Sequence, residues 1–149
     1  MSYLLDTCVL SKLRRISKFP DKKLQNWIEQ HPASQYFIST FSLSEILAGI
    51  SKLDDTLLDR KYKMELEDWL FNDLIPDFDG RIINFDLKLA LRWGALIGNL
   101  KKKGINLPII DSLIAVTAIH HDFTLVTENT IDFEQTGAMI INPWNFCGL

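Results

Sequence analysis

The sequence predicts an α/β fold in which a central, mostly parallel β-sheet of about five strands is flanked by helices on both faces. Short apolar segments alternate along the chain with segments whose apolar residues recur three or four positions apart. The 149 residues also contain no internal repeat and no linker rich in proline, glycine or serine. We therefore expect a single domain over residues 1–149, which is an ordinary length for one domain.

The first part of the chain is expected to form two strands separated by two helices. Residues 2–6 are mostly apolar and end at a polar Asp-Thr pair, which is typical of a buried strand. Apolar residues then recur at helical spacing over residues 9–17, and again between Pro20 and Pro32. Residues 36–41 are aromatic and β-branched, which favours a second strand.

The middle of the chain is expected to contain two helices. Ser42 and Glu45 have the Ser-x-x-Glu spacing of a capping box, so the first helix is predicted to begin at Ser42. Gly49 lies inside this helix, where glycine costs about 1 kcal/mol relative to alanine. Residues 57–74 have charged side chains on one face and apolar side chains on the other, which predicts one long amphipathic helix.

The remaining elements continue the alternation of strands and helices. Residues 81–85 predict a third strand, and residues 87–103 predict a helix that ends in three lysines before a glycine. Pro108 is expected to open the next helix, because proline fits the start of a helix. Compact apolar segments over residues 123–127 and 138–141 complete the predicted sheet.

Acidic residues occur where the chain is expected to leave the sheet. Asp6 ends the first predicted strand, Glu45 follows the second, and Asp111 lies in the first turn of the last long helix. Asn129 and Asp132 follow the next predicted strand. Parallel sheets place ligand sites beyond the carboxyl ends of their strands, so the fold could bring these side chains together. Each acid alone also fits a local role, as a turn residue, a capping partner or a charge at a helix start.

Converging carboxylates would have a definite physical consequence. Three or four of them within a few ångströms cannot all stay ionised unless a cation joins them. Oxygen ligands select hard cations such as Mg²⁺ or Mn²⁺, which activate water for phosphodiester hydrolysis. The net charge of −3 argues against a protein that coats nucleic acid by bulk electrostatics, but it is compatible with a nuclease that has a local acidic site.

Four segments of the sequence carry a family resemblance: LLDTCVLS, STFSLSEILAGI, LPIIDSLIAVTAIHHD and TLVTENTIDFE. In this order and spacing they span nearly the whole chain and resemble PIN domains, more narrowly the VapC-type toxins of bacterial toxin–antitoxin pairs. The resemblance implies a sheet flanked by helices, with acids that bind Mg²⁺, or Mn²⁺ in its place. It also implies an endoribonuclease that forms homodimers and is neutralised by a small DNA-binding antitoxin encoded nearby.

The resemblance also assigns roles to individual residues by position. Asp6, Glu45 and Asp111 match the first three acids of the family, which implies that they hold the metal ion. Asp132 matches the fourth acid, because the other position that can supply this acid holds the neutral Asn129. All four acids are accordingly expected to be catalytic. Supporting hydrogen bonds are expected from Thr7, Thr127 and Asn129.

The sequence departs from many members of the family at two positions. Cys8 stands where asparagine is common, and it is expected to be packed rather than reactive, because acidic neighbours disfavour a thiolate. Glu128 stands where arginine is common, which removes one positive charge near the predicted site. Weaker attraction of phosphate, or a different substrate, could follow.

Basic residues are weaker candidates for contact with RNA. Lys12, Arg14 and Arg15 follow the first strand, and Arg92 lies on the helix that ends in three lysines. For such clusters a solvated helix face is the alternative interpretation. The tryptophans form no ladder that would suggest base stacking, and they are expected to fill the core or an interface: Trp27, Trp69, Trp93 and Trp144.

A cytoplasmic protein without a membrane span is expected. The start of the chain lacks a basic segment followed by a long apolar one, and no window approaches about 18 uninterrupted apolar residues. Cys8 and Cys147 make no disulfide framework, and reduced thiols are typical of the cytosol.

Together these observations favour a Mg²⁺-dependent endoribonuclease toxin that hydrolyses RNA phosphodiester bonds. The alternative is a PIN-fold module that binds nucleic acid or protein and has weak or lost catalysis. The presence of Asp6, Glu45 and Asp111 argues against this alternative, because a degenerate site has no need of all three acids.

Overall fold

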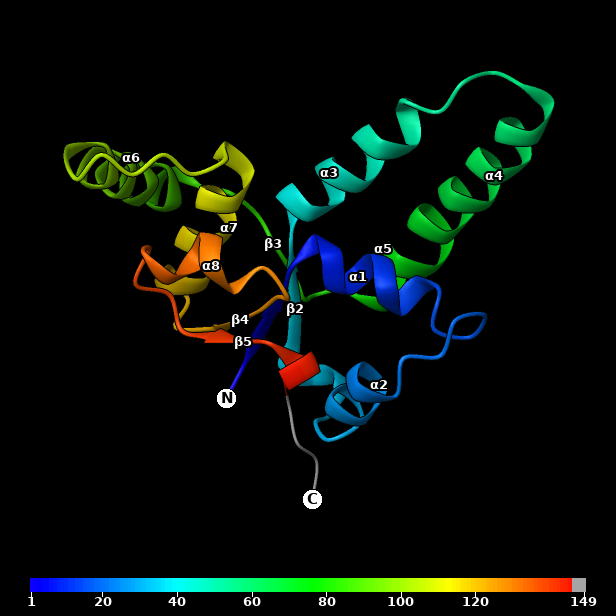
Figure 1. The fold of residues 1–149 in the computed structure, drawn as a ribbon, viewed down its shortest axis with the longest axis horizontal. Coiled ribbons are helices and arrows are strands. Elements are labelled where there is room, and N and C mark those ends of the chain that lie inside the picture. The colour runs from blue at the N-terminus through cyan, green and yellow to red at the C-terminus, as the bar shows by residue number, and fades with distance from the viewer. Residues whose placement is uncertain (146–149) are drawn as a thin grey trace.

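Five parallel strands form one sheet in the computed structural model, which describes residues 1–145 (Figure 1). The strands are β1 (Tyr3–Leu5), β2 (Tyr36–Ser39), β3 (Ile82–Ile83), β4 (Thr124–Val126) and β5 (Ile140–Ile141). Their order in the sheet is β3-β2-β1-β4-β5, and every pairing is parallel. The predicted α/β class is therefore confirmed, although each strand is shorter than the segment expected from the sequence.

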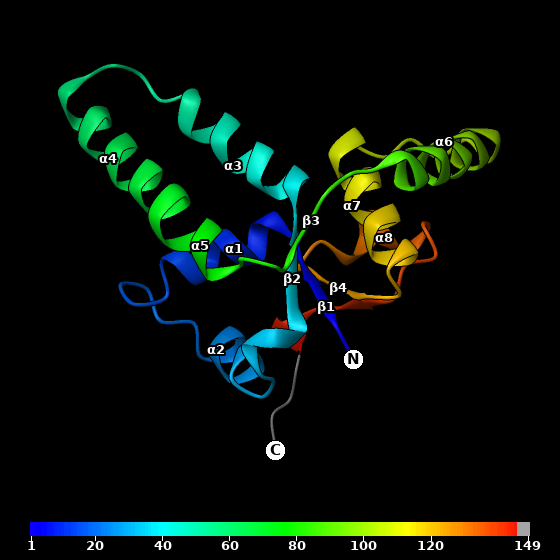
Figure 2. The ribbon, with the colours of Figure 1, turned by 180° about the vertical axis from the view of Figure 1, so that it is seen from behind.

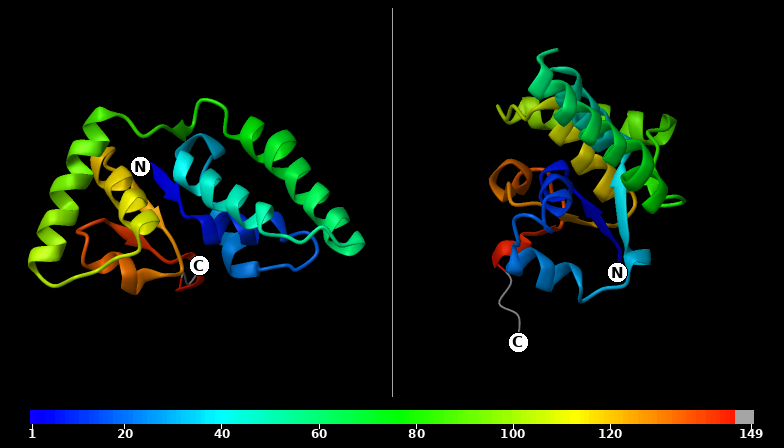
Figure 3. Two further views of the ribbon diagram at one scale, coloured as in Figure 1. Left: turned by 90° about the horizontal axis from the view of Figure 1, so that it is seen from above. Right: turned by 90° about the vertical axis from the view of Figure 1, so that its right-hand side faces the viewer.

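Helices connect the strands and lie on both faces of the sheet. They are α1 (Thr7–Arg14), α2 (Lys22–Ile28), α3 (Thr40–Ser51), α4 (Leu57–Asp68), α5 (Ile75–Asp77), α6 (Leu87–Lys102), α7 (Ile109–His120) and α8 (Thr130–Glu134). Two 3₁₀ turns, η1 (Ala33–Gln35) and η3 (Pro143–Asn145), and the π-helical segment η2 (Trp69–Leu74) complete the described elements. Figures 1 and 2 show α3 and α4 on one side of the molecule and α6 and α7 on the other. The view from above in Figure 3 places β1 between these two pairs.

Two buried clusters lie on opposite faces of the sheet. Successive side chains of a strand point to opposite faces, so Tyr3 and Leu5 of β1 join one cluster and Leu4 joins the other. The first cluster also includes residues of α1, α2 and α3, whereas the second includes residues of α7 and α8. Both faces of the sheet are thus covered by helices, as the apolar strands predicted.

The predicted start of α3 at a capping box is wrong. The helix begins at Thr40, and the Ser39 hydroxyl at the end of β2 accepts a hydrogen bond from the Phe41 N–H at 3.1 Å. Ser42 lies inside the first turn and is fully buried. Because Ser39 rather than Ser42 caps the helix, Glu45 is not needed as a capping partner. Its carboxylate instead accepts a hydrogen bond from the Thr7 hydroxyl.

The predicted long helix over residues 57–74 is also interrupted. The α-helical geometry of α4 ends at Asp68, and the π-helical η2 follows before Pro76 in α5. No residue of α4 is buried, whereas Leu70 and Leu74 of η2 enter the core. The wider π turn changes the spacing of core-facing residues, which a uniform helical periodicity does not reveal. Within residues 1–145, no helix combines the length and the apolar character needed to cross a membrane.

Candidate active site

Asp6 lies at the centre of the carboxyl edge, because it directly follows β1, the middle strand of the sheet. Its backbone N–H donates to the Val126 carbonyl at 3.0 Å. Its side-chain Oδ1 accepts a hydrogen bond from the Thr7 N–H at 2.8 Å and so caps α1. The Asp6 side chain is only 6% exposed. The end of β1 and the start of α1 therefore hold this carboxylate in a defined position.

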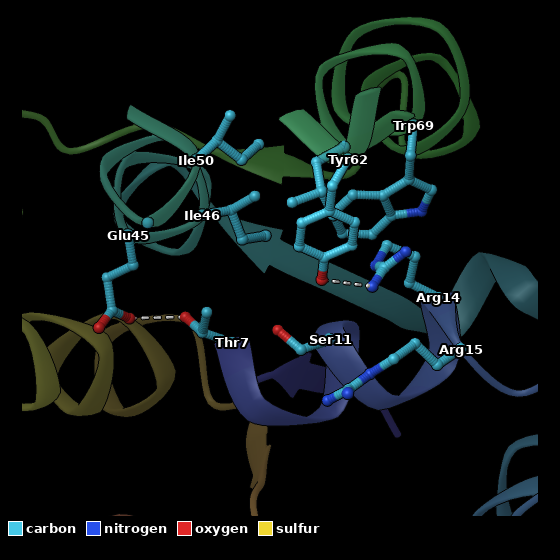
Figure 4. Close-up of a pocket in the computed structure, with 11 residues that line it drawn as sticks. Thr7, Ser11, Arg14, Arg15, Glu45, Ile46, Ile50, Tyr62 and Trp69 are labelled. Carbon is cyan, nitrogen blue, oxygen red and sulfur yellow. Dashed lines mark hydrogen bonds between the residues drawn. The ribbon is translucent and has the colours of Figure 1, made fainter. Parts of the chain in front are cut away.

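Glu45 reaches the same edge from the second turn of α3. The Thr7 hydroxyl donates to Glu45 Oε1 at 2.6 Å, as the dashed line in Figure 4 shows. Hydrogen bonds to an ionised carboxylate are stronger than those between neutral groups. This contact joins the start of α1 to α3, and it places Thr7 where the sequence predicted a supporting donor.

The segment after β4 supports Asp6 through a chain of hydrogen bonds. The Thr127 hydroxyl donates to Asp6 Oδ2 at 2.8 Å and accepts from the backbone N–H of Asn129 at 3.1 Å. The Asn129 side-chain amide donates in turn to Asp132 Oδ2 at 2.5 Å. Thr127 and Asn129, the two residues after β4 that were expected to donate supporting hydrogen bonds, therefore each bind an acid: Thr127 binds Asp6, and Asn129 binds Asp132.

Asp111 lies in the first turn of α7, where the charges of the other acids act on its carboxyl group. Its pKa is raised from the usual 3.8 to about 6, first by burial and then by the negative charges of Asp6, Glu45 and Asp132. The fold thus brings the four predicted acids close enough for their charges to interact. Within residues 1–145, however, no three His, Cys, Asp or Glu side chains are placed so that they could hold a metal ion directly.

A cavity of about 570 Å³ opens beside these acids, and we call it the acid cavity. It is lined by Asp6, Thr7, Cys8, Ser11, Glu45, Asp111, Glu128 and Asn129. Asp132 does not line the cavity and is linked to it through Asn129. Sequence reasoning did not assign Ser11 to the site, although Ser11 lies one helical turn after Thr7 and helical spacing could have indicated it.

Cys8 contributes a thiol to the acid cavity. Its Sγ lies 3.6 Å from Asp6 Oδ2, to which the thiol donates a weak hydrogen bond. Burial raises the pKa of Cys8 to about 11, and the charge of Asp6 adds to this effect. A protonated thiol agrees with the expectation that Cys8 is packed rather than reactive. Cys147, the other cysteine considered in the sequence, lies outside the described residues.

The basic candidates lie in three different places. Lys12 Nζ is 2.8 Å from Oε2 of Glu128, so its charge offsets that of Glu128 beside the acid cavity. Arg14 and Arg15 line a second cavity that adjoins the acid cavity. Arg92 is exposed on α6 and lines neither cavity. Lys12 is therefore paired beside the acid cavity, Arg14 and Arg15 lie in the adjoining cavity, and Arg92 is apart from both.

The family model of the PIN domain matches residues 3–138 of the chain. The chain belongs to the PIN-domain family. The plasmid stability protein StbB of Pseudomonas syringae pv. tomato is 30% identical to it over 141 residues, which are 95% of this PIN-domain chain and 97% of the relative. The VapC ribonuclease Y4jK of Sinorhizobium fredii is 29% identical over 141 residues, which are 95% of this chain and 96% of the relative. Toxin FitB of Neisseria gonorrhoeae is 29% identical over 142 residues, which are 95% of this chain and 98% of the relative.

Solved structures of PIN-domain relatives have the same fold. A chain of FitAB bound to an IR36 DNA fragment is 27% identical, has a TM-score of 0.84, and matches over 98% of both chains. A chain of VapBC2 from Rickettsia felis, bound to a promoter DNA fragment, is 28% identical with a TM-score of 0.68, over 95% of this chain and 98% of that chain. A chain of a toxin–antitoxin complex from Klebsiella pneumoniae is 26% identical with a TM-score of 0.61. The match covers 97% of this chain and 100% of that chain.

Proposed function

We propose that this PIN-domain chain is a divalent-metal-dependent endoribonuclease and the toxin of a toxin–antitoxin pair. The observation that carries the proposal is that Asp6, Glu45 and Asp111 line one cavity at the carboxyl edge of the sheet, with the charge of Asp132 acting on Asp111. Burial, and then the negative charges of Asp6, Glu45 and Asp132, raise the pKa of Asp111, and a shared cation would offset both effects. Relatives named as a VapC ribonuclease and as toxin FitB support the same activity.

Mg²⁺, or Mn²⁺ in its place, fits the donor atoms of the acid cavity. The proposed metal ligands are Asp6, Glu45 and Asp111, which offer only oxygen atoms, and hard cations prefer these. Mg²⁺ usually keeps several waters and is held through one or two carboxylates, so the site does not need a preformed set of three ligands. When bound, the ion would supply positive charge at the phosphodiester and an activated water.

The other residues of the site would keep the acids in place during catalysis. Thr7 and Thr127 donate hydrogen bonds that fix the orientation of Glu45 and Asp6, respectively. Lys12 neutralises Glu128 beside the cavity, which reduces the repulsion that a phosphate group would meet there. Binding and orienting RNA at a hydrolysable bond is therefore the task that these side chains suit best.

We further propose a small antitoxin, encoded nearby, as the partner of this chain, with the toxin acting in the cytoplasm as a homodimer. Chains with the same fold occur in FitAB and in VapBC2 bound to DNA, and in a toxin–antitoxin complex. An arginine of the antitoxin could reach the carboxylates of Asp6, Glu45 and Asp111 as a bidentate cation in place of the metal ion.

RNA cleavage by the purified protein tests the proposed enzyme. Because the proposed ligands are all oxygens, Mg²⁺ or Mn²⁺ should support cleavage of single-stranded RNA on a denaturing gel, and excess EDTA should abolish it. Cleavage that persists in excess EDTA would contradict the metal mechanism. RNA binding without cleavage in either metal would favour the alternative, a PIN-fold binding module.

A pair of substitutions tests which residue after β4 completes the site. Asp132→Asn should weaken Mg²⁺ binding and slow cleavage, because it removes a charge that acts on Asp111. Asn129→Ala should have the smaller effect, although it removes the 2.5 Å hydrogen bond to Asp132. Cleavage rates at several Mg²⁺ concentrations measure both effects. If Asn129→Ala is the more damaging, with both variants equally stable to heat, the assignment of Asp132 is wrong.

A further inference from the structure

The second cavity adjoins the acid cavity between α1, α3 and α4, and its volume is about 260 Å³ (Figure 4). Thr7, Ser11 and Glu45 line both cavities, so a ligand at the acids has a path into this space. Figure 4 shows Arg14 and Tyr62 at the opposite end from Glu45. We call this space the arginine–aromatic cavity.

Arginine and aromatic side chains are already in contact in this cavity. The guanidinium carbon of Arg14 lies 5.8 Å from the ring centre of Tyr62 and 5.9 Å from that of Trp69. Arg14 Nη2 also donates to the Tyr62 hydroxyl at 3.3 Å. Trp69 packs against the core, whereas Tyr62 is 42% exposed. The Tyr62 ring therefore has surface left for stacking with a ligand.

The charge of the cavity favours an anionic ligand. Among residues 1–145 the one ion pair joins Lys12 and Glu128, so neither Arg14 nor Arg15 is paired with a carboxylate of the described chain. Guanidinium groups bind phosphate with a matching planar geometry, and aromatic rings stack on nucleobases. A nucleotide carries both a phosphate and a base. Two arginines and one carboxylate, Glu45, line this cavity, so its charge is positive at the end where Arg14 and Tyr62 lie.

Gly49 leaves the α3 side of the cavity open. It lies in the interior of α3 and is exposed, and a Cβ atom at this position would meet no other atom within 4 Å. Packing of the protein itself therefore does not require glycine here, although glycine weakens a helix. Space for a ligand is a role that the missing side chain can serve.

We propose that the arginine–aromatic cavity binds one nucleotide of an RNA strand, next to the phosphodiester that lies at the acids. The base stacks on Tyr62, and the phosphate contacts Arg14 and Arg15. This inference rests on the proposed ribonuclease function, because it places a neighbouring part of the same substrate. The volume of about 260 Å³ lies just below the range of about 300–1,000 Å³ that is usual for small-molecule sites, so the cavity suits a single nucleotide.

RNA binding by a Gly49→Leu variant tests the nucleotide site without weakening the fold. Leucine fills the cavity but favours a helix, so the unfolding temperature should not fall. We expect the dissociation constant for a single-stranded RNA of about 12 nucleotides, measured by fluorescence anisotropy in EDTA, to rise about 10-fold. Gly98→Leu is the matched control, since Gly98 is also an exposed helical glycine at which an added Cβ would meet no atom within 4 Å, and this variant should bind RNA like the wild type.

Substitutions of Tyr62 and Arg14 separate stacking from charge. Tyr62→Ala should weaken RNA binding about 10-fold, whereas Tyr62→Phe keeps the ring and should bind nearly as well as the wild type. Arg14→Gln should lower the slope of log affinity against log salt concentration by about 0.7, because one phosphate contact is lost. Wild-type RNA affinity in both Gly49→Leu and Tyr62→Ala would overturn the inference.

Separate measurements of binding and cleavage distinguish this inference from the proposed function. A wild-type protein that binds RNA but does not cleave it with Mg²⁺ contradicts the ribonuclease, while weaker binding by Gly49→Leu would still support the nucleotide site. If the wild type cleaves RNA, and Gly49→Leu binds RNA normally but no longer binds the co-purified antitoxin, the cavity is a protein-binding site and the inference is wrong.

Discussion

Replacement of Asp6 by asparagine is expected to lower the rate of RNA cleavage by about 100-fold or more. Asp6 follows the middle strand, is 6% exposed, and accepts hydrogen bonds from the Thr7 N–H and the Thr127 hydroxyl. Asparagine can keep the bond from Thr7, but it removes the negative charge at the centre of the proposed metal site. The rate of cleavage of one RNA substrate at saturating Mg²⁺ measures this effect.

The Asp6→Asn variant should keep its fold, so the loss of activity can be assigned to chemistry. The substitution relieves repulsion of Asp111, which offsets the weaker contact with Thr127, and we expect the unfolding free energy in EDTA to change by no more than about 1 kcal/mol. Asp79→Asn is the control, because Asp79 is an exposed carboxylate that does not line the acid cavity. A normal cleavage rate in Asp6→Asn would exclude Asp6 as a metal ligand.

Expression of the wild-type chain without its partner is expected to stop bacterial growth. A ribonuclease whose acid cavity is open to RNA would act on cellular transcripts until a partner covers the cavity. Growth curves after induction measure the effect, with protein levels compared on a gel. The Asp6→Asn variant, expressed at the same level, should allow growth because it lacks the proposed activity.

Co-expression of the small protein encoded next to this chain should restore growth. The expected basis is the proposed cation of the antitoxin, which would occupy the carboxylates of Asp6, Glu45 and Asp111 in place of the metal ion. Co-purification of the two proteins would support this result. Unimpaired growth with the wild-type chain alone, at confirmed expression, would instead favour the binding-module alternative.

The positions of the five strands could be predicted from the sequence because each is short and apolar, although β2 and β3 end at Ser39 and Ile83, two residues before the predicted ends. The parallel sheet then brings Asp6, Glu45 and Asp111 to one edge, although 39 and 66 residues separate them along the chain. The start of α3 could not be predicted in the same way. Ser39 and Ser42 are both suitable caps, and only the end of β2 at Ser39 decides between them.

The arginine–aromatic cavity could not be predicted from the sequence. The residue pattern places Trp69 in the core or at an interface, and Trp69 does pack against the core, but it also lines this cavity together with Tyr62 and Arg14. These residues come from α1, α4 and η2, and the change from α to π geometry at Trp69 gives no clear signal in the residue pattern. The sequence identifies Lys12 only as a basic candidate, because its ion pair with Glu128 joins positions 116 residues apart.

The proposed metal site is tested most directly by a Mn²⁺ titration of the wild-type protein and the Asp6→Asn variant. Isothermal titration calorimetry measures Mn²⁺ binding, and RNA cleavage is measured over the same range of Mn²⁺ concentrations. If the acids hold the catalytic ion, the wild type should bind Mn²⁺ with half-saturation near the concentration that gives half-maximal cleavage, and Asp6→Asn should lose both. Equal Mn²⁺ binding by the two proteins, or full cleavage where no Mn²⁺ is bound, would contradict a metal site at Asp6, Glu45 and Asp111.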